Sequence, residues 1–214
     1  MTDTSVNKKR ETMPKVVDKE AKKNEIVQAA IRVFAKKGVA NTKMADIARA
    51  VGIGKGTIYE YFKNKNEIFT ESFNHYMEMV DTVMGKQLFK VTDPVQKLKA
   101  LIIGWTEIMS DFGYDYIEVM LEFWAEGIRR NHDGGMGLSD MNKLYADYRT
   151  VVKAILDEGI RLGKFKKMNT TLTASILIGA LDGLMLQWIL DKSLFTIDDA
   201  ATHLFDEFLQ GIIK

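Results

Sequence analysis

The segment from Gly54 to Phe62, GKGTIYEYF, carries polar side chains of the kinds that bind nucleic acids. Lys55 offers an ammonium group, Thr57 a hydroxyl and Tyr59 a phenol, and each can donate hydrogen bonds to phosphate oxygens or base edges. Gly56 lies among them and has no side chain to keep the backbone away from a polyanion. If the segment is helical and its apolar side chains face inward, we expect these polar groups to project outward.

The stretch around this segment, from Asn41 to Asn66, predicts the elements that would position it. A helix is expected to begin near Thr42, a candidate N-cap, and a second short helix is expected from Lys55 to Phe62. Ala48 is small enough to let the two helices cross closely, and Gly52 permits the left-handed backbone of a tight turn. The apolar side chains that would fill the wedge between the helices are Ile47, Val51, Ile53 and Ile58. Proteins with a helix-turn-helix present a helix to the DNA major groove in this way.

Further helices are predicted on both sides of this motif. Apolar residues recur at helical spacing from Asp18 to Lys37, and Gly38 follows as a candidate C-cap. A capping pattern at Asn64 predicts a long helix that reaches Leu88. Lys63 and Lys65 lie at its N-terminal end, where the helix dipole and free amides favour a phosphate. The complete set of candidate DNA-binding residues is Thr42, Lys43, Lys55, Gly56, Thr57, Tyr59, Tyr61, Lys63 and Lys65.

The charge distribution also favours a DNA-binding N-terminal part. Residues 1–70 contain 15 Lys or Arg against 8 Asp or Glu, a net charge of +7, whereas the remainder carries 15 against 21, which gives −6 and a total of +1. A basic third on an acidic body suits a polyanion-binding domain attached to a second module. Residues 1–17 are charged and poor in apolar side chains, so we expect a disordered basic arm, either solvated or in contact with DNA phosphates.

The rest of the chain predicts only helices. They are expected from the Asp93-Pro94 helix start, from Tyr116 to Arg129, from Ser139 to Leu162, from Thr170 to Leu190 and from Asp198 to Ile213. The predicted fold is therefore all-α, with an N-terminal three-helix helix-turn-helix domain and a C-terminal helical domain. Its expected boundaries are residues 18–64 for the helix-turn-helix domain and 65–214 for the C-terminal helical domain.

The helix predicted from Thr170 to Leu190 is apolar on nearly every side. Asp182 and Gln187 interrupt it, and a membrane-spanning helix tolerates a central carboxylate poorly, so we expect a buried soluble helix. One of its faces still needs a partner outside its own core. A homodimer in which the last two helices of each copy form a four-helix bundle would supply that partner, and a monomer core is the alternative.

A cluster of aromatic and methionine side chains falls in the middle helices, consisting of Trp105, Met109, Phe112, Tyr116, Met120, Phe123 and Trp124. Such a cluster is either ordinary core packing or the lining of a pocket for a bulky apolar ligand. Glu118 and Glu122 lie one helical turn apart beside it. They are either solvated or face inward, where they would pair with a cationic ligand over an aromatic ring.

The sequence gives no support for catalysis, a cofactor or a metal site. The chain has no cysteine, only three histidines and no glycine fingerprint of a nucleotide-binding loop. His132 and Asp133 are adjacent in a glycine-rich loop, without partners at ligand spacing, so we interpret them as loop residues. The charged N-terminus is unlike an export signal, and the lack of cysteine fits a reducing cytoplasm, which is the expected location.

The run ADIARAVGIGKGTIYEYFKNKNEIF, preceded by IVQAAIRVFAKKGVANT, resembles the DNA-binding domain of TetR-family transcriptional regulators. The resemblance covers the N-terminal third, and KGTIYEYFKNK is its most distinctive part. It implies a homodimer with a helical C-terminal domain that binds a small-molecule effector. Gly54 departs from the pattern, because many members have a side chain there that can cap the recognition helix.

The function implied by this resemblance is a ligand-responsive regulator, in the first instance a repressor, that binds a palindromic operator as a homodimer. A small hydrophobic or aromatic effector would release it from DNA. The alternatives are a DNA-binding protein that responds to no ligand and a helical interaction protein that does not bind DNA.

Overall fold

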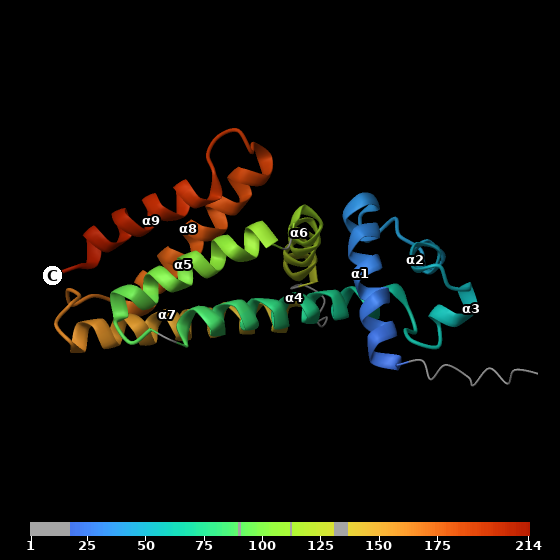
Figure 1. The fold of residues 1–214 in the computed structure, drawn as a ribbon, viewed down its shortest axis with the longest axis horizontal. Helices are drawn as coiled ribbons and strands as arrows, with labels where there is room; N and C mark the ends of the chain where they lie inside the picture. Colours follow the sequence, from blue (N-terminus) through green and yellow to red (C-terminus); the bar gives the residue numbers. More distant parts are fainter. Residues whose placement is uncertain (1–17, 90, 112, 131–136) are drawn as a thin grey trace, which may run out of the picture.

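The computed structural model describes residues 18–89, 91–111, 113–130 and 137–214, and these residues form helices without any β-strand (Figure 1). The first three helices lie at one end of an elongated molecule. A long fourth helix runs from there along the body, where the later helices pack over it. The all-α expectation is confirmed, while the predicted arm at 1–17 lies outside the described residues.

The first three helices form the head of the molecule. They are α1 (Lys19–Lys37), α2 (Met44–Val51) and α3 (Lys55–Ile58). The Asp18 carboxylate caps α1 by accepting hydrogen bonds from two backbone amides. Gly38 and Gly52 follow α1 and α2 with φ values of 73° and 77°, the left-handed region that glycine adopts at little cost. Both glycines therefore end their helices as the sequence predicted.

Thr42 does not cap α2. Its hydroxyl turns back and donates to the carbonyl oxygen of Gly38 at 2.9 Å, and its side chain is buried. The N-cap position belongs instead to Lys43, whose backbone amide donates to the Asp46 carboxylate at 3.1 Å. The prediction for Thr42 was wrong because the hydroxyl fastens the end of α1 to the following loop.

The α3 helix is shorter than the predicted span from Lys55 to Phe62. Its α-helical turn ends at Ile58, and the next amides bond three residues back, from Tyr59 to Gly56 and from Tyr61 to Ile58. Two glycines near its start weaken helix propensity, and Gly54 occupies the N-cap without a side-chain hydrogen bond. The polar segment is therefore one helical turn followed by tight turns.

The body contains α4 (Lys65–Leu88), α5 (Pro94–Asp111), α6 (Gly113–Arg130), α7 (Gly137–Arg161), α8 (Thr170–Leu190) and α9 (Ile197–Ile212). Asn64 caps α4 by accepting from the amide of Glu67 at 2.9 Å, as predicted. Two starts differ from the sequence prediction, since α6 and α7 each begin two or three residues early, at Gly113 and Gly137. The sequence prediction placed a break at each glycine because glycine is flexible. Glycine can also adopt helical backbone angles, and at both positions it forms part of the first turn.

The hydrophobic core of the head continues into the body. Phe69 of α4 packs edge-on against Phe34 of α1 with ring centroids 5.7 Å apart, and it stacks on Phe123 of α6 at 4.0 Å. One buried cluster therefore includes side chains of α1, α2, α4 and α6. The first turns of α4 belong physically to the head, and α6 lies between head and body (Figure 1).

Among the described helices, only α8 is long and apolar enough to cross a membrane by length and composition. Its inner side packs on α7 and contributes Ala174 and Leu177 to the buried core. The carboxylate of Asp182 lies within the same helix and accepts a hydrogen bond from Tyr145 of α7. One side of α8 therefore packs in the core, but only 17% of its most apolar stretch is buried, so the prediction of a buried helix holds for that side alone.

Candidate nucleic-acid interface and ligand pocket

The exposed side of α3 presents the predicted polar groups. Ile58 and Phe62 are buried in the core of the head, while Lys55 and Gly56 are exposed. Tyr59 is 49% exposed, unusually high for an aromatic residue, and Thr57 is partly exposed. The arrangement can place an ammonium, a hydroxyl and a phenol against the floor of a DNA groove.

Cations flank this surface at two helix starts. Lys43 precedes α2 and Lys63 precedes α4, and both are exposed. The backbone amide of Lys63 donates to Glu67 at 2.6 Å, which holds the chain in place before α4. Tyr61 is partly buried against the core of the head, so its ring is a less accessible candidate.

Lys65 differs from the other predicted phosphate ligands. Its ammonium donates to the carbonyl oxygens of Val39 and Ala40 at 2.7 and 2.8 Å. These two bonds fasten the loop between α1 and α2 to the start of α4. Any phosphate contact would use its remaining N–H, because an ammonium has three donors.

The Asp46 carboxylate orients α2 for this surface. It accepts from the amide of Lys43, pairs with Lys37 at 3.1 Å and lies 3.9 Å from Arg49. The backbone hydrogen bond and the cation of Lys37 lower the pKa of Asp46 below its usual 3.8. It therefore stays ionised at neutral pH and anchors the helix that packs beneath α3.

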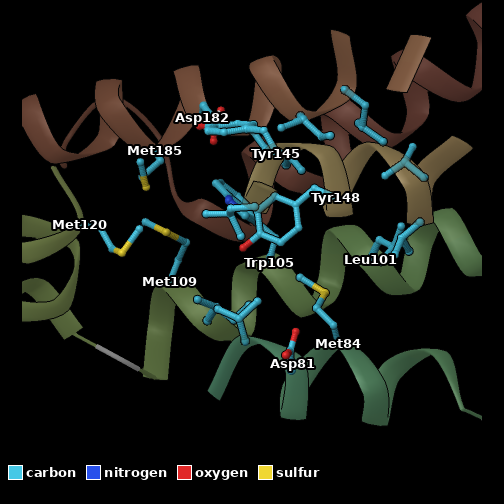
Figure 2. A pocket seen from close by; sticks show the side chains of 18 of the residues that line it. Asp81, Met84, Leu101, Trp105, Met109, Met120, Tyr145, Tyr148, Asp182 and Met185 are labelled. Atoms are coloured by element: carbon cyan, nitrogen blue, oxygen red, sulfur yellow. Dashed lines mark hydrogen bonds between the residues drawn. The ribbon is translucent and has the colours of Figure 1, made fainter. Parts of the chain in front are cut away.

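A pocket of about 450 Å³ lies in the body, between α4, α5, α7 and α8, with α6 at one end. Four of the predicted ligand-binding residues line it, namely Trp105, Met109, Met120 and Trp124. Figure 2 shows the first three of them at the cavity. A pocket of this size suits a ligand the size of a typical drug molecule.

The other predicted pocket residues lie elsewhere. Phe123 stacks on Phe69 and Phe73 in the core that joins head and body. The Tyr116 hydroxyl donates to Gln28 of α1 at 2.9 Å. Phe112 lies outside the described residues. Phe123 and Tyr116 face the head, because one side of α6 lies against the head and the other lies against the pocket.

Several pocket residues escaped the sequence prediction. Tyr76 and Asp81 come from α4, Tyr145 and Tyr148 from α7, and Asp182 from α8. The Tyr145 hydroxyl donates a hydrogen bond to the Asp182 carboxylate at 2.8 Å. The signal in the sequence was Asp182 itself, a carboxylate in an otherwise apolar helix, because a buried carboxylate is costly unless it is paired or hydrogen-bonded.

Burial controls the ionisation of these polar groups. It raises the pKa of Asp182 above its usual value, although the Tyr145 hydroxyl stabilises the charged form. Burial, followed by the charge of Asp182, raises the pKa of Tyr76 to about 12. Burial is also the main cause of the raised pKa values of Tyr145 and Tyr148, followed by the charge of Asp182 for Tyr145 and by the neighbouring Tyr76 and Asp81 for Tyr148. The phenols therefore remain neutral hydrogen-bond donors at physiological pH.

A polar relay connects the pocket end of α6 to the head. Gln28 of α1 accepts from Tyr116 of α6, and its amide nitrogen lies 2.6 Å from Nε2 of His75 on α4. One and two turns further along α6, Met120 and Trp124 line the pocket. The same helix thus lines the pocket and contacts the head.

The described residues contain no group of three His, Cys, Asp or Glu side chains that could hold a metal ion. Glu118 and Glu122, considered for a cationic ligand, do not line the pocket. Glu122 approaches Gly38 at the end of α1, since its carboxylate lies 3.4 Å from where a Cβ at that glycine would be. The acids at the pocket are Asp81 and Asp182 instead.

Two family models match the chain. Residues 26–71 match the model of bacterial regulatory proteins of the tetR family, and residues 109–214 match the model of the C-terminal domain of BetI-type transcriptional repressors. The two matches together cover most of the chain. They include most of the head and the pocket-lining residues from Met109 onward.

Individual proteins resemble the chain over nearly its whole length. The fatty acid metabolism regulator protein of Bacillus subtilis is 23% identical, over 91% of this chain and 97% of the relative. A transcriptional regulator from Saccharomonospora viridis, solved in complex with choline, has a TM-score of 0.79 and 22% identity over 91% and 99% of the two chains. The regulator FadR from Bacillus subtilis, in complex with stearoyl-CoA, has a TM-score of 0.72 and 22% identity over 88% and 98%. The chain belongs to the TetR family of ligand-responsive transcriptional repressors.

Proposed function

We propose that the protein acts in the cytoplasm as a homodimer that binds a palindromic operator and releases it when an effector fills the body pocket. One observation carries this proposal. Tyr76, Val80 and Met84 of α4 line the pocket, and Ile68 and Phe69 of the same helix lie in the core of the head. A ligand that moves α4 would therefore move the surface formed by α3.

The outer side of α8 supports the homodimer. One stripe along it contains Leu172, Ile176, Gly179, Gly183, Leu186 and Leu190, spaced three or four residues apart. Its four large side chains are exposed, and a Cβ at either glycine would meet nothing within 4 Å. Large apolar side chains around two glycines allow a second helix to approach closely.

The exposed side of α9 is polar and includes His203, Asp206 and Glu207. In the proposed dimer α8 supplies most of the apolar contact, and α9 supplies the polar rim of a four-helix bundle. Ile176→Glu should give a monomer in size-exclusion chromatography with light scattering. Asn142→Glu on the exposed surface of α7 is the matched control and should remain a dimer.

The operator surface is proposed to use two copies of α3. A two-fold axis through paired α8 helices would present two equivalent heads, and each would enter a major groove of a palindromic site. Lys55, Thr57 and Tyr59 are proposed to reach bases or the adjacent backbone, while Lys43 and Lys63 hold phosphates. We omit Thr42 from this set because it is buried.

The effector is proposed to be a small molecule with a substantial apolar part. The pocket contains two tryptophans and four methionines, which pack adaptably around apolar surfaces. The choline and stearoyl-CoA bound by the similar structures differ greatly in size and charge, so they support a ligand pocket without specifying its ligand.

Operator selection tests this proposal. The full-length protein would select sites from a random duplex library, and the enriched site would be bound again with and without metabolite extract. We expect a palindrome and a loss of affinity of about 5- to 150-fold with the active fraction, the usual range of allosteric coupling. Enrichment of no sequence would contradict the proposal, and equal affinity with every fraction would contradict the release step.

A further inference from the structure

The described walls of the pocket carry two carboxylates and no cationic side chain. Asp182 comes from α8 and Asp81 from α4, and Figure 2 shows them on opposite sides of the cavity. No described Lys, Arg or His lines the pocket, and none of the described cations forms an ion pair with Asp182. The cavity therefore carries negative charge without a counter-ion from the described chain.

Asp182 is only partly compensated by its surroundings. The Tyr145 hydroxyl donates to Oδ2 at 2.8 Å, which uses one acceptor site of a carboxylate that can accept about four hydrogen bonds. Burial raises its pKa, as expected for a charge that has lost hydration. A buried charge is costly unless it is paired, so a positive group in the pocket would recover part of that cost.

Aromatic rings surround the space between the two acids. Figure 2 shows Trp105, Tyr145 and Tyr148 lying between Asp182 at one side and Asp81 at the other. The ring centroids of Tyr145 and Tyr148 are 6.4 Å apart, and that of Trp124 is 6.5 Å from Tyr145. Aromatic faces attract cations, most strongly where water is excluded.

The remainder of the pocket is apolar and large. Its methionines, Met84, Met109, Met120 and Met185, offer polarisable surface around the charged zone. A volume of about 450 Å³ leaves room for an extended apolar group in addition to a charged head. A carboxylate ligand would instead meet two like charges, which disfavours a free fatty acid.

We infer that the effector is an organic cation with a bulky apolar body, whose charged group lies beside Asp182 and the rings of Tyr145 and Trp105. This rests on the proposed function, because it identifies the pocket as the effector site. It differs from the sequence hypothesis, which gave the anionic role to Glu118 or Glu122.

Three ligands that share a ten-carbon chain test the charge preference. Decyltrimethylammonium, 1-decanol and decanoate would be titrated into the full-length protein without DNA, below their micellar concentrations, by calorimetry. We expect decyltrimethylammonium to bind tightest and decanoate weakest. Decanoate binding as tightly as the cation, or no binding of the cation, would overturn the inference.

Asp182→Asn keeps the shape of the side chain and removes its charge. It should weaken decyltrimethylammonium binding by roughly 30-fold or more, the lower range for truncating one member of a buried charge pair, and leave decanol binding unchanged. Glu118→Gln, an acid-to-amide change outside the pocket, is the control and should bind normally. Equal cation affinity in Asp182→Asn and the unaltered protein would overturn the role of Asp182.

Three further measurements accompany these titrations. Circular dichroism establishes whether each variant is folded. Asp81→Asn removes the second carboxylate of the pocket and should also weaken binding of decyltrimethylammonium. Operator binding is measured separately with selected DNA. Tight, Asp182-dependent binding that leaves operator affinity unchanged would support the cation site while contradicting the release step of the proposed function.

Discussion

The relay between α1, α4 and α6 should hold the head to the body with a measurable free energy. Gln28 accepts from Tyr116 at 2.9 Å and contacts His75 at 2.6 Å, and these groups are partly buried. A hydrogen bond in such a setting contributes about 0.5–1.5 kcal/mol net. Tyr116→Phe should therefore lower the free energy of unfolding by about 1 kcal/mol, and Gln28→Ala, which removes both contacts, by about 2 kcal/mol.

A double-mutant cycle isolates the bond shared by these two residues. Because both substitutions remove the same contact, the double variant should lose about 2 rather than 3 kcal/mol, an interaction energy of about 1 kcal/mol. Unfolding would be followed by urea at one fixed protomer concentration, since dimer stability depends on concentration. Tyr59→Phe, which removes an exposed hydroxyl, is the matched control. Additivity within about 0.3 kcal/mol would refute the relay.

The same cycle tests whether the relay transmits the ligand signal. A contribution of about 1 kcal/mol corresponds to about a fivefold change in an equilibrium constant. Tyr116→Phe should change the ratio of operator affinities measured with and without decyltrimethylammonium by up to that factor. An unchanged ratio, together with the expected loss of stability, would mean that the relay only joins the two parts.

Three further predictions concern other sites. Lys63→Ala should weaken binding to all DNA sequences about equally and reduce the salt slope of the affinity by roughly one unit. Lys65→Ala should mainly lower the stability of the protein. Equal salt slopes for Lys63→Ala and the unaltered protein would contradict the phosphate contact. Asp182→Asn should raise the melting temperature at neutral pH by about 2–4 °C per kcal/mol of stability recovered. The reason is that the pKa of Asp182 is raised in the folded protein, so stability is lost as the pH rises through that pKa. The gain should vanish below the usual carboxyl pKa of 3.8, and a variant that melts at a lower temperature at neutral pH would contradict this prediction. Gly159→Ala should cost about 1–3 kcal/mol in urea unfolding, because the added Cβ would overlap the buried ring of Phe165, and an unchanged midpoint would contradict that packing.

The head was predictable because its signals are local. Gly38 and Gly52 marked left-handed helix ends, and Asn64 marked the start of α4, so each element could be read within a few residues. The prediction failed where a side chain suited to a local capping role makes a different hydrogen bond in the folded protein. Thr42 had the hydroxyl of an N-cap, but the carbonyl of Gly38 uses it.

The pocket was only half predictable because its walls come from five helices distant in sequence. The aromatic cluster identified α5 and α6 correctly, yet periodicity could not separate Trp124, which lines the pocket, from Phe123, which fills the core. Tyr76 and Tyr145 lie about 70 residues apart, and only tertiary packing brings them to one cavity. Asp182, which lies beside both tyrosines, argues from the sequence alone only against a membrane-spanning α8.

The position of Asp182 on α8 joins ligand recognition to the proposed dimer. Leu177, Asp182 and Met185 face the pocket from one side of this helix, while the stripe of Ile176, Gly179 and the residues aligned with them faces outward on the other. In the proposed dimer, a cation that pairs with Asp182 would pull on a helix whose opposite side packs against the partner subunit. Glycines in that stripe leave no side chain to resist a small shift. The distance between the two heads would then depend both on a shift of α4 within one subunit and on a shift of α8 at the proposed dimer interface.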